Sequence, residues 1–246
     1  MRYHTRVDEE ILLAPLRTPP AYAAVVERLR RAVALGFVLP GERLPSERTL
    51  AERLEVSRVT IREALRLLQG QGLLVTKRGS GGTVVAAGAT SIGRLGEEYK
   101  AEVGEVFEYR LAVETMAARL AAQRGSEENI AELLSCQESL AASSDVGSFR
   151  RADSEFHLTV ALMSGNNMLR QSVEDARAAA FSWLDLRKFH VVHESSIQGH
   201  AAIINAITRH DPEEAAAAMA AHIDQAHSEV LAALADPPRE AVPGNR

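Results

Sequence analysis

Apolar residues recur at helical spacing along most of this 246-residue chain. The first such segment covers residues 22–35, where Val25, Leu29 and Val33 lie four residues apart. Residues at this spacing share one face of an α-helix. Gly36 directly after the segment is a suitable helix stop. We therefore expect an amphipathic helix here.

Two shorter helices and a hairpin are predicted next. Ser46 is a suitable N-cap for a helix that ends near residue 54, and Ser57 for a helix that runs to about residue 69. The β-prone residues 73–76 and 83–85 flank a glycine-rich loop, which is typical of a hairpin. This order of elements predicts a winged helix-turn-helix, which places one helix in the major groove of DNA.

The remainder of the chain is predicted to be helical. Between residues 103 and 234 there is no convincing strand pattern, and we expect an antiparallel bundle of six or seven helices. The amphipathic stretches cover about 103–124, 127–143, 146–164, 167–189, 195–210 and 212–235. The predicted fold is thus mostly α. The expected organisation is an arm at 1–19, a winged helix-turn-helix at 20–86, a linker at 87–99, an all-helical domain at 100–235 and a disordered tail at 236–246.

Composition narrows the class of protein. Hydrophobic residues make up 46% of the chain and charged residues 25%, which is ordinary for a globular protein. The single Cys136 excludes an intramolecular disulfide and favours a reducing compartment. No run of 18 apolar residues predicts a membrane span, and the N-terminus does not have the pattern of a signal peptide. We therefore expect a cytoplasmic protein with no membrane partner.

The charge is distributed unevenly. The net charge of −5 alone argues against a nucleic-acid binder. However, residues 1–85 hold 14 Lys and Arg against 9 Asp and Glu, whereas residues 86–246 hold 14 against 24. A basic first domain on an acidic second domain is consistent with DNA contact at one end of the molecule.

The helix predicted after Ser57 carries the candidate DNA contacts. Arg58 and Arg62 lie one turn apart, away from its apolar face, and arginine bonds guanine bidentately. Ser57, Thr60 and the amides of the helix start suit phosphate contact.

Two neighbouring segments extend this candidate surface. Arg48 begins the preceding helix and could reach the same groove, and Arg78 with the glycine loop from Gly79 could lie along the minor groove or the backbone. The alternative is that the arginines form a solvated, salt-bridged face with Glu52 and Glu63.

Histidines are concentrated in the second domain. Seven of the eight lie after residue 150. Asp153 and His157 are four residues apart, and His200 and His222 lie on the apolar sides of their predicted helices. Three neutral imidazoles and a carboxylate that converge inside a bundle would form a divalent-metal site, and Zn²⁺ or Ni²⁺ suits such ligands. The alternative is that each histidine is a hydrogen-bonded core residue.

A further candidate is Arg110, which lies on a core-facing helix and therefore requires an anion. Glu114, one turn later, is the simple structural partner. The functional alternative is that Arg110 is a bidentate clamp for a ligand carboxylate, and Glu114 is then a further candidate effector-binding residue.

The run PGERLPSERTLAERLEVSRVTIREALRLLQGQGLL and the glycine hairpin after it resemble the DNA-binding domain of GntR-family bacterial transcription regulators. The resemblance covers about residues 20–86. It implies that Arg48, Arg58 and Arg62 contact bases and that Gly79 lies at the wing tip. Glu55 departs from the family, which usually has glycine in the turn. A positive φ there would cost up to ~1 kcal/mol.

The second half resembles the FCD domain of the FadR-like branch of this family. The segments that carry the resemblance are EVFEYRLAVETMAARLAA, DSEFHLTVALMSGNNML, GHAAIINAI and AAAMAAHI. The resemblance implies a metal site at the positions of Asp153, His157, His200 and His222. It also implies that Arg110 and Asn167 line the effector cavity.

The resulting hypothesis is a metabolite-responsive repressor that binds a pseudo-palindromic operator as a homodimer. A small organic acid would bind the metal and Arg110, and no enzymatic activity is expected. Three alternatives stay open. The ion itself could be the signal or a purely structural element, or the metal could activate water in a hydrolase.

Overall fold

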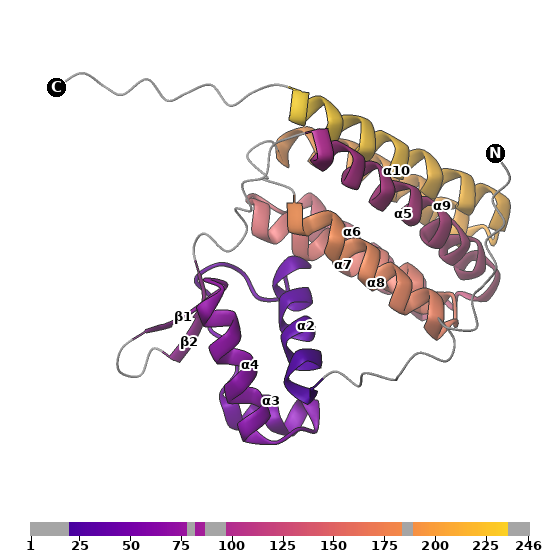
Figure 1. Cartoon of the computed structure of the whole chain (residues 1–246). Helices are drawn as coiled ribbons and strands as arrows, with labels where there is room; N and C mark the ends of the chain where they lie inside the picture. Colours follow the sequence, from indigo (N-terminus) through magenta and orange to yellow (C-terminus); the bar gives the residue numbers. More distant parts are fainter. Residues whose placement is uncertain (1–19, 78–81, 87–96, 184–188, 236–246) are drawn as a thin grey trace, which may run out of the picture.

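The computed structural model describes residues 20–77, 82–86, 97–183 and 189–235. It has a small N-terminal part, which we call the head (residues 20–86), and a larger helical part, which we call the body (residues 97–235). Figure 1 shows the head below one end of the stacked body helices. The mostly α fold with an N-terminal winged helix-turn-helix is confirmed.

The head contains three helices and one hairpin among its described residues. These are α2 (Ala21–Ala34), α3 (Glu47–Leu54), α4 (Arg58–Gly70), β1 (Leu74–Lys77) and β2 (Gly82–Val85). The strands pair antiparallel, with Leu74 opposite Val85. Both predicted caps are present, because the hydroxyl groups of Ser46 and Ser57 accept hydrogen bonds from the backbone amides three residues later.

The turn between α3 and α4 contains the residue that departs from the family pattern. Glu55 has φ 54°, which is the left-handed conformation that favours glycine. The positive φ that the sequence analysis considered at Glu55 is therefore present, and it lowers the stability of the protein by up to ~1 kcal/mol.

The described part of the body consists of α5 (Glu97–Arg124), α6 (Glu127–Ala141), α7 (Val146–Met163), α8 (Asn167–Trp183), α9 (Phe189–Thr208) and α10 (Pro212–Ala235). The all-helical prediction is confirmed, with two corrections to boundaries. Helix α5 begins at Glu97, inside the expected linker 87–99, and α9 begins at Phe189 instead of residue 195. The β-branched pair Val191–Val192 lowers local helix propensity, which obscured the start of α9 in the sequence.

Helix α7 lies at the centre of the body and packs against α5, α6, α8 and α9. Its buried Phe156 and Val160 belong to the main core, together with residues of α5, α9 and α10 such as Ala121, Ile203 and Met219. This central position lets one helix reach several neighbours. None of the helices formed by the described residues combines the length and the apolar character needed to cross a bilayer.

The head is attached to the body through α2 and the turn after it. Arg31 of α2 lies 3.3 Å from Glu174 and 2.5 Å from Asp175, both on α8. Arg151 of α7 donates a hydrogen bond of 3.0 Å to the carbonyl oxygen of Gly36. Gly36 has φ +81°, and a Cβ there would lie 3.0 Å from the backbone nitrogen of Arg151. Only glycine permits this close contact without strain.

Candidate functional sites

The exposed face of α4 carries the arginines expected to read DNA. Buried Ile61, Leu65 and Leu68 fix the opposite face of the helix in the core of the head. The side chains of Arg58 and Arg62 keep 59% and 48% of their surface exposed. The two cations are therefore accessible to a duplex.

Glu47 at the start of α3 pairs with these two arginines, a contact that the sequence did not predict. Its Oε2 atom lies 2.8 Å from Nε of Arg62 and 3.9 Å from a terminal nitrogen of Arg58. Glu52 lies 3.9 Å from Nε of Arg48, an exposed pair that contributes little. The salt-bridged alternative is thus partly realised, but the arginines remain on the surface.

The start of α4 is also exposed. Ser57 caps the helix and its hydroxyl lies 2.8 Å from that of Thr60, so both polar side chains lie beside the free amides of the first turn. Val59, which sequence reasoning did not mark, is 62% exposed on this turn. A methyl-bearing side chain there could contact the methyl group of thymine. Arg78 and Gly79 lie outside the described residues.

The four predicted metal ligands come together in the body. Asp153 and His157 lie on α7, His200 on α9 and His222 on α10, and all four are buried. One possible ligand atom from each lies within 4.8 Å of the others. Spacing along one helix brings the first two together, whereas tertiary packing brings in the remaining two.

The distances between the ring nitrogens fit a single small cation. Nε2 of His157 lies 3.2 Å from Nε2 of His222 and 3.3 Å from Nε2 of His200. Ligand atoms around a tetrahedral Zn²⁺ are about 3.3 Å apart when the Zn–N bonds are about 2.0 Å. Oδ1 of Asp153 lies 3.5 Å from Nε2 of His200. Three imidazoles and one carboxylate are a donor set that suits Zn²⁺ or Ni²⁺.

Glu114 on α5 orients one of these histidines. Its Oε2 atom lies 2.5 Å from Nδ1 of His157, while its Oε1 atom accepts a hydrogen bond of 2.7 Å from Nε of Arg110. Burial raises the pKa of Glu114, but Arg110 and His157 outweigh this and hold the pKa well below its usual value. The carboxylate is therefore ionised, and it favours the His157 tautomer whose Nε2 lone pair is free to bind a metal.

The other two histidines are held in the neutral form. Burial lowers the pKa of both His200 and His222 well below the usual value, and the positive charges of Arg110 and Arg177 lower each further. Neutral imidazole is the form that binds a cation. His200 and His222 therefore have the protonation state that metal binding requires.

Arg177 on α8 is a site residue that the sequence analysis missed. Its guanidinium is paired with Oδ2 of Asp153, and burial lowers the pKa of Arg177 to about 9. Arg177 lies at helical spacing from the buried residues Val173 and Ala180, so the sequence places it on the apolar face of α8. The same pattern had indicated Arg110.

A cavity of about 40 Å³ lies beside the cluster and is lined by the buried Arg110 and Arg177. The terminal nitrogen NH2 of Arg110 has no hydrogen-bond partner among the described residues, so a donor is available there. The other lining residues include Phe107, Phe149, Asp153, Ser196 and His222. The volume is enough for water but too small for an organic acid, so an effector requires the cavity to widen.

Two predicted effector residues lie elsewhere. Asn167 is exposed at the start of α8, ten residues before Arg177, which is about 15 Å along a helix. Glu114 lies behind the cavity and not in its lining. Helix α8 thus contributes Arg177 to the cavity in place of Asn167, and Glu114 contributes by holding Arg110 and His157.

Comparison with known proteins gives a consistent result across both domains. Residues 21–85 match the family described as bacterial regulatory proteins, gntR family, and residues 105–225 match the FCD domain. The chain is 31% identical over 229 residues to the HTH-type transcriptional repressor NanR of an Enterobacter species, covering 89% of this chain and 88% of the relative. NanR of Escherichia coli is 31% identical over 221 residues, covering 85% and 84%.

A solved structure shares the fold. Escherichia coli McbR/YncC superposes with a TM-score of 0.57 at 21% sequence identity, covering 88% of this chain and 99% of that chain. At this level of identity the likeness concerns the architecture alone.

Proposed function

Because the chain belongs to the GntR family of bacterial regulatory proteins and is a DNA-binding transcription regulator and not an enzyme, we propose that it represses transcription in response to a small organic acid. In this proposal a homodimer presents two heads to a pseudo-palindromic operator. The relatives in Enterobacter and Escherichia coli bear the name of repressors, which supports repression over activation. A regulator of bacterial DNA works in the cytoplasm.

The proposal that the head reads DNA rests on the exposed side chains of Arg58 and Arg62 on the free face of α4. Both would bond base edges in the major groove, with Arg48 at the edge of the same surface. Ser57 and Thr60 would contact phosphate at the helix start. We assign Arg78 and Gly79 to the wing contact on the strength of the family resemblance alone.

The observation that carries effector binding is the buried cluster of Asp153, His157, His200 and His222 beside a cavity lined by two arginines. A bound Zn²⁺ or Ni²⁺ ion with a coordination number above four would keep these protein ligands and accept a carboxylate oxygen as a further ligand. Arg110 would bind the other oxygen through its unpartnered nitrogen. Once the cavity widens, the charges of its lining would therefore suit a sugar acid, hydroxy acid or dicarboxylate.

The geometry suggests how effector binding in the body would change the position of the DNA-binding head. A ligand carboxylate competes with Asp153 for Arg177 on α8, and the same turn of α8 carries Glu174 and Asp175, which hold Arg31 of the head. Breaking the first pair favours a different position of α8. If the ligand binds more tightly to one position of the head than to another, it increases the population of the first position.

A metal-responsive regulator is the alternative within the same fold. In that case removal of the ion alone changes operator affinity, and an organic acid at constant metal does not. In the proposed case, the acid changes operator affinity while the metal stays bound.

Operator binding tests the head. Arg58→Ala should weaken binding to the specific sequence by ~1–3 kcal/mol, which fluorescence anisotropy titrations measure. Arg66→Ala, an exposed arginine farther along α4, is the matched control and should have a smaller effect. If the Arg58 variant binds specific and random DNA as the wild type does, the assigned role is wrong.

Metal content tests the body. Mass spectrometry of the native protein should find one ion per chain, and His157→Ala should lose it. His210→Asn is the control, because His210 lies outside the cluster and its φ of 52° is a conformation that asparagine tolerates. An unchanged metal content in the His157 variant would show that the ion is bound elsewhere.

A further inference from the structure

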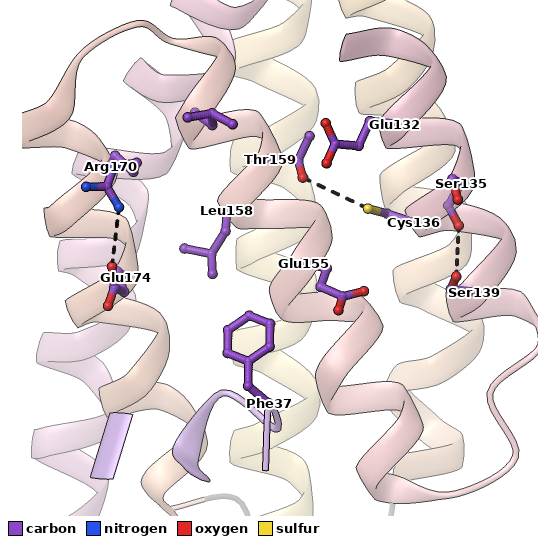
Figure 2. A pocket seen from close by; sticks show the side chains of 11 residues that line it. Phe37, Glu132, Ser135, Cys136, Ser139, Glu155, Leu158, Thr159, Arg170 and Glu174 are labelled. Carbon is purple, nitrogen blue, oxygen red and sulfur yellow. Dashed lines mark hydrogen bonds and ion pairs between the residues drawn. The ribbon is translucent and has the colours of Figure 1, made fainter. Parts of the chain in front are cut away.

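A second cavity lies where the head meets the body. None of the four candidate metal ligands is part of its lining. Its volume is about 490 Å³, within the usual range for small-molecule pockets. Body helices α6, α7 and α8 form most of its wall, and Phe37 of the head closes one side (Figure 2). The complete lining is Phe37, Glu132, Ser135, Cys136, Ser139, Glu155, Leu158, Thr159, Leu162, Arg170 and Glu174.

Part of this lining is apolar and open to solvent. Phe37 is 40% exposed and Leu162 is 56% exposed, although both are large apolar side chains. In Figure 2 the Phe37 ring rises from the head toward Leu158. A ligand that covered these side chains would be stabilised by roughly 25 cal/mol per Å² of apolar surface removed from water.

The charged part of the lining is acidic. Glu174 is already paired, at 3.3 Å from Arg31 and 3.6 Å from Arg170. In contrast, neither Glu132 nor Glu155 has an ion pair or side-chain hydrogen bond with any residue that the structure describes.

The two unpaired carboxylates lie on opposite sides of Cys136 along the cavity wall (Figure 2). Burial raises the pKa of the Cys136 thiol, and the negative charges of Glu155 and Glu132 raise it further. Both carboxylates therefore act on the same small region, and the net charge of the lining favours a cation.

We propose that this cavity binds a small molecule with a protonated amine and an apolar body. The ammonium group bonds to Glu155 in the field of Glu132, and the apolar part covers Phe37 and Leu158. An organic acid is excluded by the same carboxylates, so this ligand differs in charge from the one assigned to the metal cluster. The proposal does not depend on the identity of that effector.

Binding would also act on the position of the head. Phe37 belongs to the head and the remaining lining residues belong to the body, so the complete cavity exists only while the two parts are docked. A ligand that prefers the docked arrangement increases its population. The cavity is therefore a second point at which a small molecule can control the regulator.

The test compares two probes of nearly the same shape. Tryptamine carries an ammonium group, and tryptophol carries a neutral hydroxyl group in its place. Isothermal titration calorimetry on the full chain should show that tryptamine binds about tenfold more tightly. Equal affinities for the two probes would overturn the proposal. No DNA is present, so the result is independent of operator binding.

Variants locate the binding site. Glu132→Gln with Glu155→Gln should abolish the preference for tryptamine, whereas the control pair Glu128→Gln with Glu138→Gln, exposed on α6 outside the lining, should keep it. Phe37→Ala should lower the binding affinity for both probes by about tenfold. Unchanged affinities in the first pair or in the Phe37 variant would place the ligand elsewhere and overturn the assignment. Circular dichroism verifies that each variant is folded.

Discussion

Gly199 of α9 and His222 of α10 meet without room for a side chain between them. A Cβ on Gly199 would lie 2.5 Å from Nδ1 of His222 and 3.1 Å from its Cβ. The second of these contacts is with the base of the side chain, so the ring cannot avoid it by rotation alone. Glycine at this position is what lets His222 reach the cluster.

Gly199→Ala should therefore displace His222 and weaken metal binding. We expect a loss of at least about tenfold in metal affinity, in the range found for residues that orient metal ligands. Competition with a chromophoric chelator measures the change. Gly104→Ala on α5 is the matched control, because a Cβ there meets nothing within 4 Å. That variant should keep its metal affinity and gain about 0.5–1 kcal/mol in stability.

Glu47 should contribute to the specificity of DNA binding. It holds Arg62 and Arg58 on the free face of α4, which limits the side-chain freedom they lose on binding bases. Glu47→Gln should lower the ratio of specific to random DNA affinity by about tenfold while raising random binding, because one negative charge is lost. Anisotropy titrations at two salt concentrations measure both. Glu52→Gln, whose exposed pair with Arg48 is weak, should leave the ratio unchanged.

Glu55→Gly should stabilise the protein. Glycine adopts the φ of 54° found at this position without the clash that a side chain introduces. We expect a gain of up to about 1 kcal/mol in the free energy of unfolding, measured by urea denaturation. Glu52→Gly in the middle of α3 should instead lose about 1 kcal/mol. A stability unchanged or reduced in the Glu55 variant would mean that its side chain makes a compensating contact.

The N-cap of α7 should add a pH-dependent contribution to stability. Oδ1 of Asp145 accepts hydrogen bonds from the amides of Gly147 and Ser148 at 2.8 and 3.0 Å. Hydrogen bonds from Ser148 lower the pKa of Asp145 below its usual value. The stabilisation by the carboxylate is therefore complete above the unfolded pKa and is lost as pH falls through the folded pKa.

Asp145→Asn separates this effect from capping itself. Its neutral amide still caps the helix, so the stability difference from wild type should shrink as pH falls below about 4. Asp145→Ala should cost about 1 kcal/mol at neutral pH. Urea denaturation between pH 6 and pH 3 follows both variants. A difference between wild type and Asp145→Asn that stays constant over this range would contradict the role of the charge.

The sequence predicted the features that depend on neighbours along the chain. Ser46 and Ser57 were recognised as caps because a cap needs only its own side chain and the next turn. Asp153 and His157 were paired by their spacing on one helix. The convergence of His200 and His222 depends on how α9 and α10 pack, and it followed from the family resemblance and not from spacing.

The features that the sequence did not predict are tertiary contacts. The pairing of Arg177 with Asp153 joins two helices, and nothing in the local pattern names the partner. Asn167 was placed near the cavity by resemblance, but the start of α8 lies too far along the helix. The contacts of Arg31 with Glu174 and Asp175 set the position of the head, and no periodicity in α2 distinguishes them from solvated charges.

On α7, Arg151 and Asp153 are separated by one residue, yet the first holds Gly36 of the head and the second belongs to the histidine cluster. A rigid helix moves as a unit, so neither contact can be adjusted alone. Substitutions that retune ligand preference through this segment would also alter gene control. Under the proposed response to an organic acid, selection for a new inducer would therefore act on α5, α9 or α10, and these helices are where divergence between homologues with different inducers should accumulate.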